Sequence, residues 1–187
     1  MALTDQMIRA SQLDVNLYEE VEKDTTQTSN ALTVVVIVAI ATGIGTAIAE
    51  AMSGAGPGGG GIVLGLIGGV IAAIVGWGIW TAIVYFIGTS LFGGTATWGE
   101  VMRTVGFANS PGVLRILAFI PIVGGLINLL VGIWTIVTTV VAVRQSLDIT
   151  TGKAIIVSII GVVVAAIVMG VIAAALAIPA IAVGALR

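Results

Sequence analysis

The chain has 187 residues, of which 58% are hydrophobic and 9% are charged, and its formal net charge is −2. Soluble domains carry about 25% charged residues, so this composition excludes a soluble globular enzyme. The absence of His and Cys from the sequence excludes imidazole metal sites, disulfides, thiol nucleophiles and Ser-His-Asp triads. Its 7 Lys and Arg residues give no basic surface for nucleic acid. We expect an all-α integral membrane protein with no enzymatic chemistry, cofactor or metal.

Residues 1–30 form a polar arm that differs in composition from the rest of the chain. Its apolar side chains recur at spacings of three and four residues, which predicts one amphipathic helix. The other face of this helix is mostly acidic, which favours docking against the protein's own loops or a partner over binding to anionic lipid. The apolar positions are Leu3, Met7, Ala10, Leu13, Leu17 and Val21.

Long apolar runs in residues 31–187 predict a bundle of five transmembrane helices. The expected spans are residues 31–49, 62–92, 106–123, 126–143 and 154–178. Glycine-rich segments at 53–61 and 93–99 predict loops between the first three spans, and a polar loop is expected at 144–153. Pro179 is expected to end the fifth span.

The distribution of basic residues predicts the orientation, because short cytoplasmic loops carry an excess of Lys and Arg. With five spans and a cytoplasmic N-terminus, five of the basic residues fall on the cytoplasmic side and the C-terminus lies outside. Four spans would move Arg144 and Lys153 to the outside, so five are favoured. The five residues are Arg9, Lys23, Arg103, Arg144 and Lys153.

Small residues at four-residue spacing predict close packing between the spans, because they let helix backbones approach one another in lipid. With 26 Gly in an apolar chain, the alternative reading is chance spacing. The second span carries a ridge of small residues, and the first and fifth spans carry shorter ones. The candidate packing residues are Gly61, Gly65, Gly69, Ala73, Gly43 and Gly170.

Four polar residues in or near the third and fourth spans form a candidate polar or lipid site. Arg115 either extends to the headgroups or pairs with Glu100, or it binds a lipid phosphate or an anionic solute. Glu100 and Arg103 are three residues apart on one helix face and are expected to pair. Asn128 is expected to bond to a neighbouring helix or to a free carbonyl near Pro121.

Several short segments resemble the Yip1 domain family. The segment from Arg103 to Pro111 (RTVGFANSP) is similar to that family's R-x-x-G-Y-A-x-x-P segment, with Phe107 where the family often has Tyr. Arg144 and the sequence TGKA at 151–154 resemble its last loop and span, and residues 13–24 resemble the start of bacterial members. The resemblance implies five spans, a cytoplasmic N-terminus, a bacterial plasma membrane and no catalytic residues.

The expected function is a scaffold or accessory subunit that packs against other membrane proteins, in a complex or homo-oligomer, or against membrane lipids. One alternative is a small-solute transporter or channel built around Pro111, Arg115, Pro121 and Asn128, because transporters place their sites at broken helices. Another alternative is a membrane anchor whose residues 1–30 recruit a soluble partner.

Overall fold

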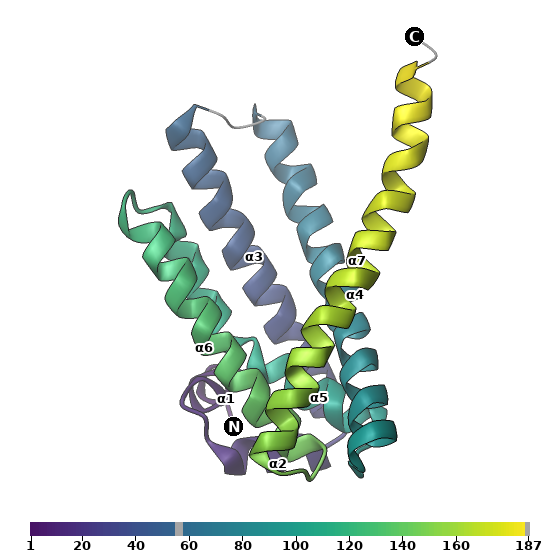
Figure 1. Cartoon of the computed structure of the whole chain (residues 1–187). Coiled ribbons are helices and arrows are strands. Elements are labelled where there is room, and N and C mark those ends of the chain that lie inside the picture. The colour runs from purple at the N-terminus through teal and green to yellow at the C-terminus, as the bar shows by residue number, and fades with distance from the viewer. Residues whose placement is uncertain (55–57, 186–187) are drawn as a thin grey trace.

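The computed structural model describes the backbone of residues 1–54 and 58–185 and the side chains of residues 1–54 and 59–172. Over these residues the chain is all-helical, with no strand (Figure 1). The elements in order are α1 (Leu3–Ser11), α2 (Val15–Lys23), α3 (Gln27–Ser53), α4 (Gly58–Phe92), α5 (Trp98–Ala108), the 3-10 helix η1 (Ser110–Phe119), α6 (Val123–Ser146) and α7 (Thr151–Ala185). Helices α1, α2 and α5 gather at one end of the bundle, which we call the arm end; α3 ends and α4 begins at the far end (Figure 1).

Four helices, α3, α4, α6 and α7, are long and apolar enough to cross a membrane. Each contains an 18-residue window of high mean hydropathy, from 2.3 in α6 to 3.1 in α7. Their positions agree with four of the five predicted spans. The chain is therefore an integral membrane protein built from apolar helices.

The third predicted span, residues 106–123, is wrong as a single α-helix. Helix α5 ends at Ala108, and the chain continues as the ten-residue 3-10 helix η1. Pro111 lacks the N–H that an α-helix needs there, and Gly112 packs so closely on α3 that an ideal Cβ would lie 2.6 Å from Val38 Cγ1. At about 2.0 Å per residue, η1 covers about 20 Å. It packs against α3 and α6 along its length.

The arm is amphipathic as predicted, but it forms two helices instead of one. Leu13 adopts a left-handed backbone conformation with φ of 64°, which ends α1. Asp14 then caps α2 by accepting a hydrogen bond from the Asn16 N–H at 3.0 Å. The apolar faces of the two helices turn toward the bundle, where Leu17 and Val21 are buried. The arm thus docks on the protein's own helices.

Several helix ends differ from the predicted loops. Gly58–Gly61 begin α4 instead of forming a loop, while residues 55–57 of the predicted loop lie outside the described residues. Trp98 opens α5, and the 144–153 loop shrinks because α6 extends to Ser146 and α7 begins at Thr151. Helix α7 continues past Pro179. In lipid the backbone must satisfy its own hydrogen bonds, so helices extend through glycine and proline that would end them in water.

The buried core lies at the arm end. It joins the arm to α5 and to the adjoining ends of α3, α4, α6 and α7. Its largest fully buried side chains are Tyr18, Phe107, Leu17, Leu147, Val21, Val34 and Val84. Toward the far end α7 spreads away from the other helices (Figure 1), and only 6% of the most apolar window of α4 is buried.

Candidate functional site

Arg103 holds the arm on the bundle. Its side chain is 5% exposed, and its Nε donates to the Val21 carbonyl at 2.8 Å while Nη2 donates to the Glu22 carbonyl. Both carbonyls lie in the last turn of α2, where a cation satisfies free acceptors and the negative end of the helix dipole. The predicted Glu100–Arg103 pair is wrong, because Glu100 caps its own helix by accepting from the Thr97 N–H at 2.6 Å.

Further polar contacts fix the arm from other sides. Trp134 Nε1 on α6 donates to the Ser11 carbonyl at 2.8 Å, and Gln145 Nε2 donates to Glu19 Oε1 at 3.0 Å. Each contact joins residues more than 100 positions apart in the chain. The arm is therefore an integral part of the fold.

The acidic residues of the arm have pKa values that are shifted in opposite directions. Arg9 pairs with Asp14 at 2.7 Å and with Glu20 at 2.9 Å, and its hydrogen bonds lower the pKa of both carboxyls. Burial raises the pKa of Glu22 to about 7, and repulsion from Glu19 adds to the effect. Glu22 Oε2 is buried without a hydrogen-bond partner among the described residues. The α2 docking site therefore contains one carboxyl that resists ionisation.

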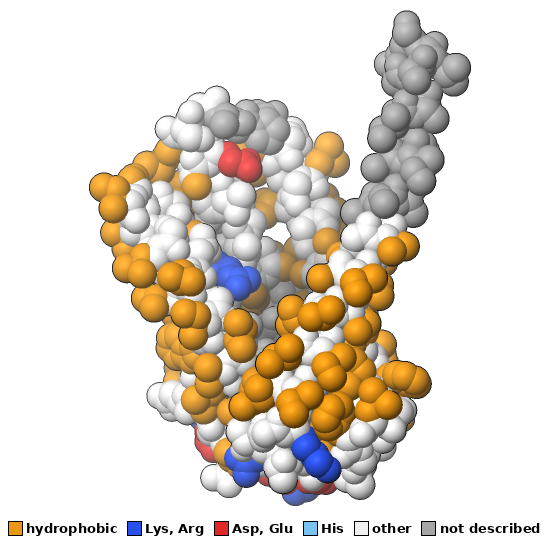
Figure 2. Space-filling model, viewed as in Figure 1, with side chains coloured by type: hydrophobic (Ala, Val, Ile, Leu, Met, Phe, Trp, Pro, Cys, Tyr) orange, Lys and Arg blue, Asp and Glu red, His pale blue; other side chains and the backbone are white. Residues whose placement is uncertain are grey.

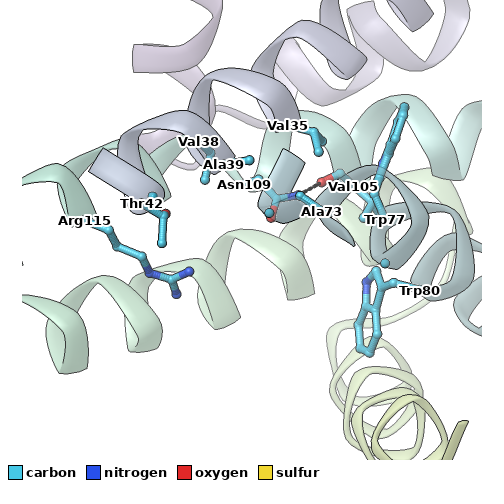
Figure 3. Close-up of a pocket in the computed structure, with 13 residues that line it drawn as sticks. Val35, Val38, Ala39, Thr42, Ala73, Trp77, Trp80, Val105, Asn109 and Arg115 are labelled. Atoms are coloured by element: carbon cyan, nitrogen blue, oxygen red, sulfur yellow. Dashed lines mark hydrogen bonds between the residues drawn. The ribbon is translucent and has the colours of Figure 1, made fainter. Parts of the chain in front are cut away.

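Arg115, on η1, lines a cavity of about 400 Å³ between α3, α4 and η1. Figure 3 shows Arg115 beside Thr42 on one side of this cavity, with Trp77 and Trp80 on the other. The remaining wall is almost entirely apolar or glycine. It consists of Val35, Val38, Ala39, Gly43, Gly69, Ala73, Gly76 and Val105, with the polar Asn109.

A second cavity, of about 350 Å³, lies against Arg115 between α4, α6 and α7. Arg115 and Trp80 line both cavities, so the two meet at these residues. Three hydroxyl residues line the second one, and sequence reasoning did not single them out: Thr135, Thr139 and Ser158. The only available signal was the four-residue spacing of the two threonines, which places them on one face of α6.

The Arg115 guanidinium makes no ion pair or side-chain hydrogen bond within the described part of the chain. The three ion pairs found there all belong to the arm. The expected partner Glu100 is hydrogen-bonded to Thr97, so the predicted pairing is wrong. Ionisable residues among membrane helices are rare and almost always pair with one another or with backbone carbonyls. The geometry therefore leaves a cation that can bind an anion.

The cluster expected for a transporter does not assemble. Asn128 and Pro121 are exposed, and neither lines a cavity with Arg115. The predicted bond from the Asn128 amide to a neighbouring helix or to a carbonyl near Pro121 is absent among the described residues. The reason is register: the Asn128 side chain lies on the outward face of α6, beside the exposed Leu129.

The candidate packing residues have different surroundings. An ideal Cβ on Gly43 would lie 2.6 Å from Leu66 Cδ2, so α3 and α4 touch there. Gly61 lines a cavity of about 320 Å³ between the same helices. A Cβ on Gly65, Gly69 or Gly170 would meet no atom of the described chain within 4 Å. Ala73, next on the α4 ridge, is half-buried at the Arg115 cavity. Gly65 lines the same cavity as Gly61, and Gly69 lines the Arg115 cavity, so the packing role of these residues stays a prediction.

Two close helix contacts occur at glycines that are not among the candidate packing residues. A Cβ on Gly45 would lie 2.5 Å from the Arg115 carbonyl oxygen, which brings α3 and η1 together. A Cβ on Gly106 would lie 2.7 Å from Ala31 Cβ, where α5 crosses α3. These glycines position η1 and, with it, Arg115.

The comparisons with known proteins agree with this membrane architecture. No curated protein and no solved structure matches the chain. The family model described as the Yip1 domain matches residues 16–183, which cover nearly all of α2 and α7 and every helix between them. The chain belongs to the Yip1 domain family.

Proposed function

We propose that this protein is a non-enzymatic scaffold or accessory subunit that assembles with other membrane proteins through the glycine face of α4. Its membership of the Yip1 domain family and its apolar helices are consistent with a membrane-associated role. The proposal also includes a bacterial plasma membrane location and five crossings, with the arm in the cytoplasm.

The arrangement of the helices supports five crossings. From the arm end, α3, η1 and α7 run outward and α4 and α6 return (Figure 1). The η1 helix and the turn at Ile120–Ile122 would make the third crossing, although η1 alone covers only about 20 Å of a core about 30 Å thick. The basic residues of the arm and α5, together with Arg144 near the end of α6 and Lys153 near the start of α7, all lie at the arm end, as cytoplasmic segments should.

The observation that carries the scaffold proposal is the open glycine face of α4. Gly65 and Gly69 are exposed, and a side chain at either position would meet no atom of the described chain within 4 Å. Lipid gives helices no hydrophobic reason to associate, so a small-residue face is where another helix gains close contact. In the single chain Gly65 and Gly69 line cavities that α4 shares with α3, so unfilled space lies beside both glycines.

A leucine placed on each side of α4 tests the proposal. Gly65→Leu adds a side chain whose Cβ meets no atom of the described chain within 4 Å, whereas the matched control Ile67→Leu changes an exposed residue on the opposite side of α4. We expect the Gly65 variant to lose co-purifying membrane proteins or its own oligomer in mild detergent, and the control to keep them. A wild-type protein that isolates as a monomer without partners would overturn the proposal.

Crosslinking gives an independent readout, because the natural sequence contains no cysteine. A single cysteine at Gly65 should form specific crosslinks in native membranes, and one at Ile67 should form fewer. Equal crosslinking at both positions would show that α4 has no preferred contact face.

A further inference from the structure

We propose that Arg115 binds the phosphate of a phospholipid that carries one net negative charge. The site is the pair of cavities that meet at Arg115 and Trp80. This inference concerns a ligand inside the bundle; the larger cavity shares Gly69 with the glycine face of α4, but the inference does not rest on the proposed partner contact.

The charge of the site calls for an anion. Arg115 is the only cationic residue in either lining, no carboxylate lines them, and its guanidinium has no acceptor among the described residues. The planar guanidinium donates two parallel hydrogen bonds to a phosphate, and a single guanidinium matches a single negative charge. A zwitterionic headgroup fits less well, because its ammonium group would find no carboxylate to pair with in these cavities.

Ser158 supplies a second group aimed at the ligand. It is 7% exposed, it lines the cavity beside Arg115, and its Oγ has no hydrogen-bond partner among the described residues. The hydroxyl of Thr139 already donates to the Thr135 carbonyl at 2.7 Å, so it keeps only acceptor capacity. Ser158 is therefore the spare hydroxyl donor in this cavity, and a phosphate oxygen would satisfy it.

The walls and the depth of the site favour a lipid over a free anion. Apolar side chains and glycines form most of both linings, and Figure 2 shows that this face of the bundle is hollowed between apolar surfaces. Arg115 lies five residues after Ser110, so it is about 10 Å from the start of η1 at a rise of about 2.0 Å per residue. That depth is in the arm-side half of the membrane, within reach of headgroups of the nearer leaflet.

An acidic helix of a partner protein would also offer an anion, but it fits the space poorly. A helix about 10 Å across fills about 400 Å³ in each 5.4 Å turn. The larger cavity has a volume of about 400 Å³ in total, so it would hold only one turn. A phosphate with the adjoining glycerol fits this space and leaves the acyl chains in the surrounding membrane.

Native mass spectrometry of the delipidated full chain in detergent tests the assignment. The probes are phosphatidylglycerol, zwitterionic phosphatidylcholine, oleate and inorganic phosphate. We expect one phosphatidylglycerol to bind at least tenfold more tightly than phosphatidylcholine. Arg115→Met should weaken this binding at least tenfold, and Ser158→Ala about threefold. The matched control Arg144→Met removes an exposed cation at the end of α6 and should change the affinity less than twofold.

Circular dichroism and the melting temperature of each variant separate loss of binding from loss of folding. Ser158→Ala removes a hydroxyl that bonds to nothing in the described chain, so it should fold normally even if Arg115→Met does not. Equal binding of phosphatidylglycerol by the wild type, Arg115→Met and Ser158→Ala would overturn the proposal. Preference for oleate or free phosphate would overturn the phospholipid assignment. An acidic membrane protein that co-purifies through Arg115, with no lipid binding, would show that a helix occupies the site.

Discussion

The two ends of the bundle are held together by different physical means. At the arm end, apolar packing is combined with long-range polar contacts, and Tyr18 and Phe107 are fully buried. Toward the far end, α4 and α7 spread apart, and exposed apolar side chains such as Leu64 and Ile71 face outward. The arm end resembles a water-soluble core, whereas the far end leaves its contacts to lipid or to other chains. The same chain therefore specifies a tightly packed arm end and a loosely packed far end.

The largest expected effect on stability is at the arm end, where Arg103 is replaced with leucine. The variant loses two charge-assisted hydrogen bonds to the carbonyls of Val21 and Glu22, and bonds of this kind contribute about 1.5–3 kcal/mol each. We expect α2 to undock and its amides to exchange with solvent at least a hundredfold faster, as measured by hydrogen–deuterium exchange. Arg144→Leu, at an exposed position, is the control. Unchanged protection of residues 15–23 would contradict the assigned role of Arg103.

A pair of glycine substitutions compares the two ends directly. Gly106→Val should destabilise the protein by about 1–3 kcal/mol, because overpacking forces neighbouring groups apart. An ideal Cβ there would lie 2.7 Å from Ala31 Cβ and 3.2 Å from its Cα, so backbone must move. Gly65→Val, where a Cβ meets nothing within 4 Å, should leave the melting temperature in detergent nearly unchanged. Equal losses in the two variants would mean that the two ends are packed alike.

The stability of the arm end should also depend on pH, through the ionisation of Glu22. Burial raises the pKa of Glu22 to about 7 from its ordinary value of 4.5. The folded state thus holds this proton more tightly than the unfolded state. The contribution of the protonated Glu22 to the stability of the fold is fully present below pH 4.5 and is lost as the pH rises through about 7. Because solvent screens this half-buried group, we expect the free energy of unfolding to fall by only on the order of 1 kcal/mol.

The measurement is the melting temperature of the arm between pH 5 and pH 8, followed by the fluorescence of Trp134, whose indole contacts the arm. Glu22→Gln cannot ionise and should remove this dependence. The carboxyls paired with Arg9 titrate below this window, because their pKa values are lowered, so they do not mask the effect. A pH profile that is the same in Glu22→Gln and the wild type would assign the titration to another group.

Local composition was enough to predict the four long apolar helices and the apolar face of the arm. Apolar runs and three-to-four spacing are properties of neighbouring residues, and they identified Leu17 and Val21 as inward-facing. The η1 helix was not predictable, because its course depends on the contact of Gly112 with Val38, which lies on another helix. Sequence spacing can show that Pro111 breaks a helix, but not which backbone conformation replaces it.

The candidate site was predictable only in part, for the same reason. Arg115 stood out because an ionisable residue in an apolar run is rare. Ser158 did not stand out, because a serine in a membrane helix commonly bonds to its own backbone. Only the three-dimensional arrangement shows that its hydroxyl has no partner beside Arg115. Arg103 was assigned to its near neighbour Glu100, whereas its actual acceptors lie 81 and 82 positions away.

The smallest expected effect separates the two helices of the arm. Trp134→Phe keeps an aromatic ring on α6 but removes the N–H that donates to the Ser11 carbonyl at 2.8 Å, a bond worth about 0.5–1.5 kcal/mol. The loss should raise hydrogen exchange in residues 3–11 and leave residues 15–23 protected, because α2 is held by Arg103. Trp98→Phe is the control, since its ring meets Tyr85 edge-on at 6.1 Å and phenylalanine preserves that contact. Exchange that rises equally in both helices would show that the arm undocks as one unit, so that α1 and α2 share a single docking equilibrium.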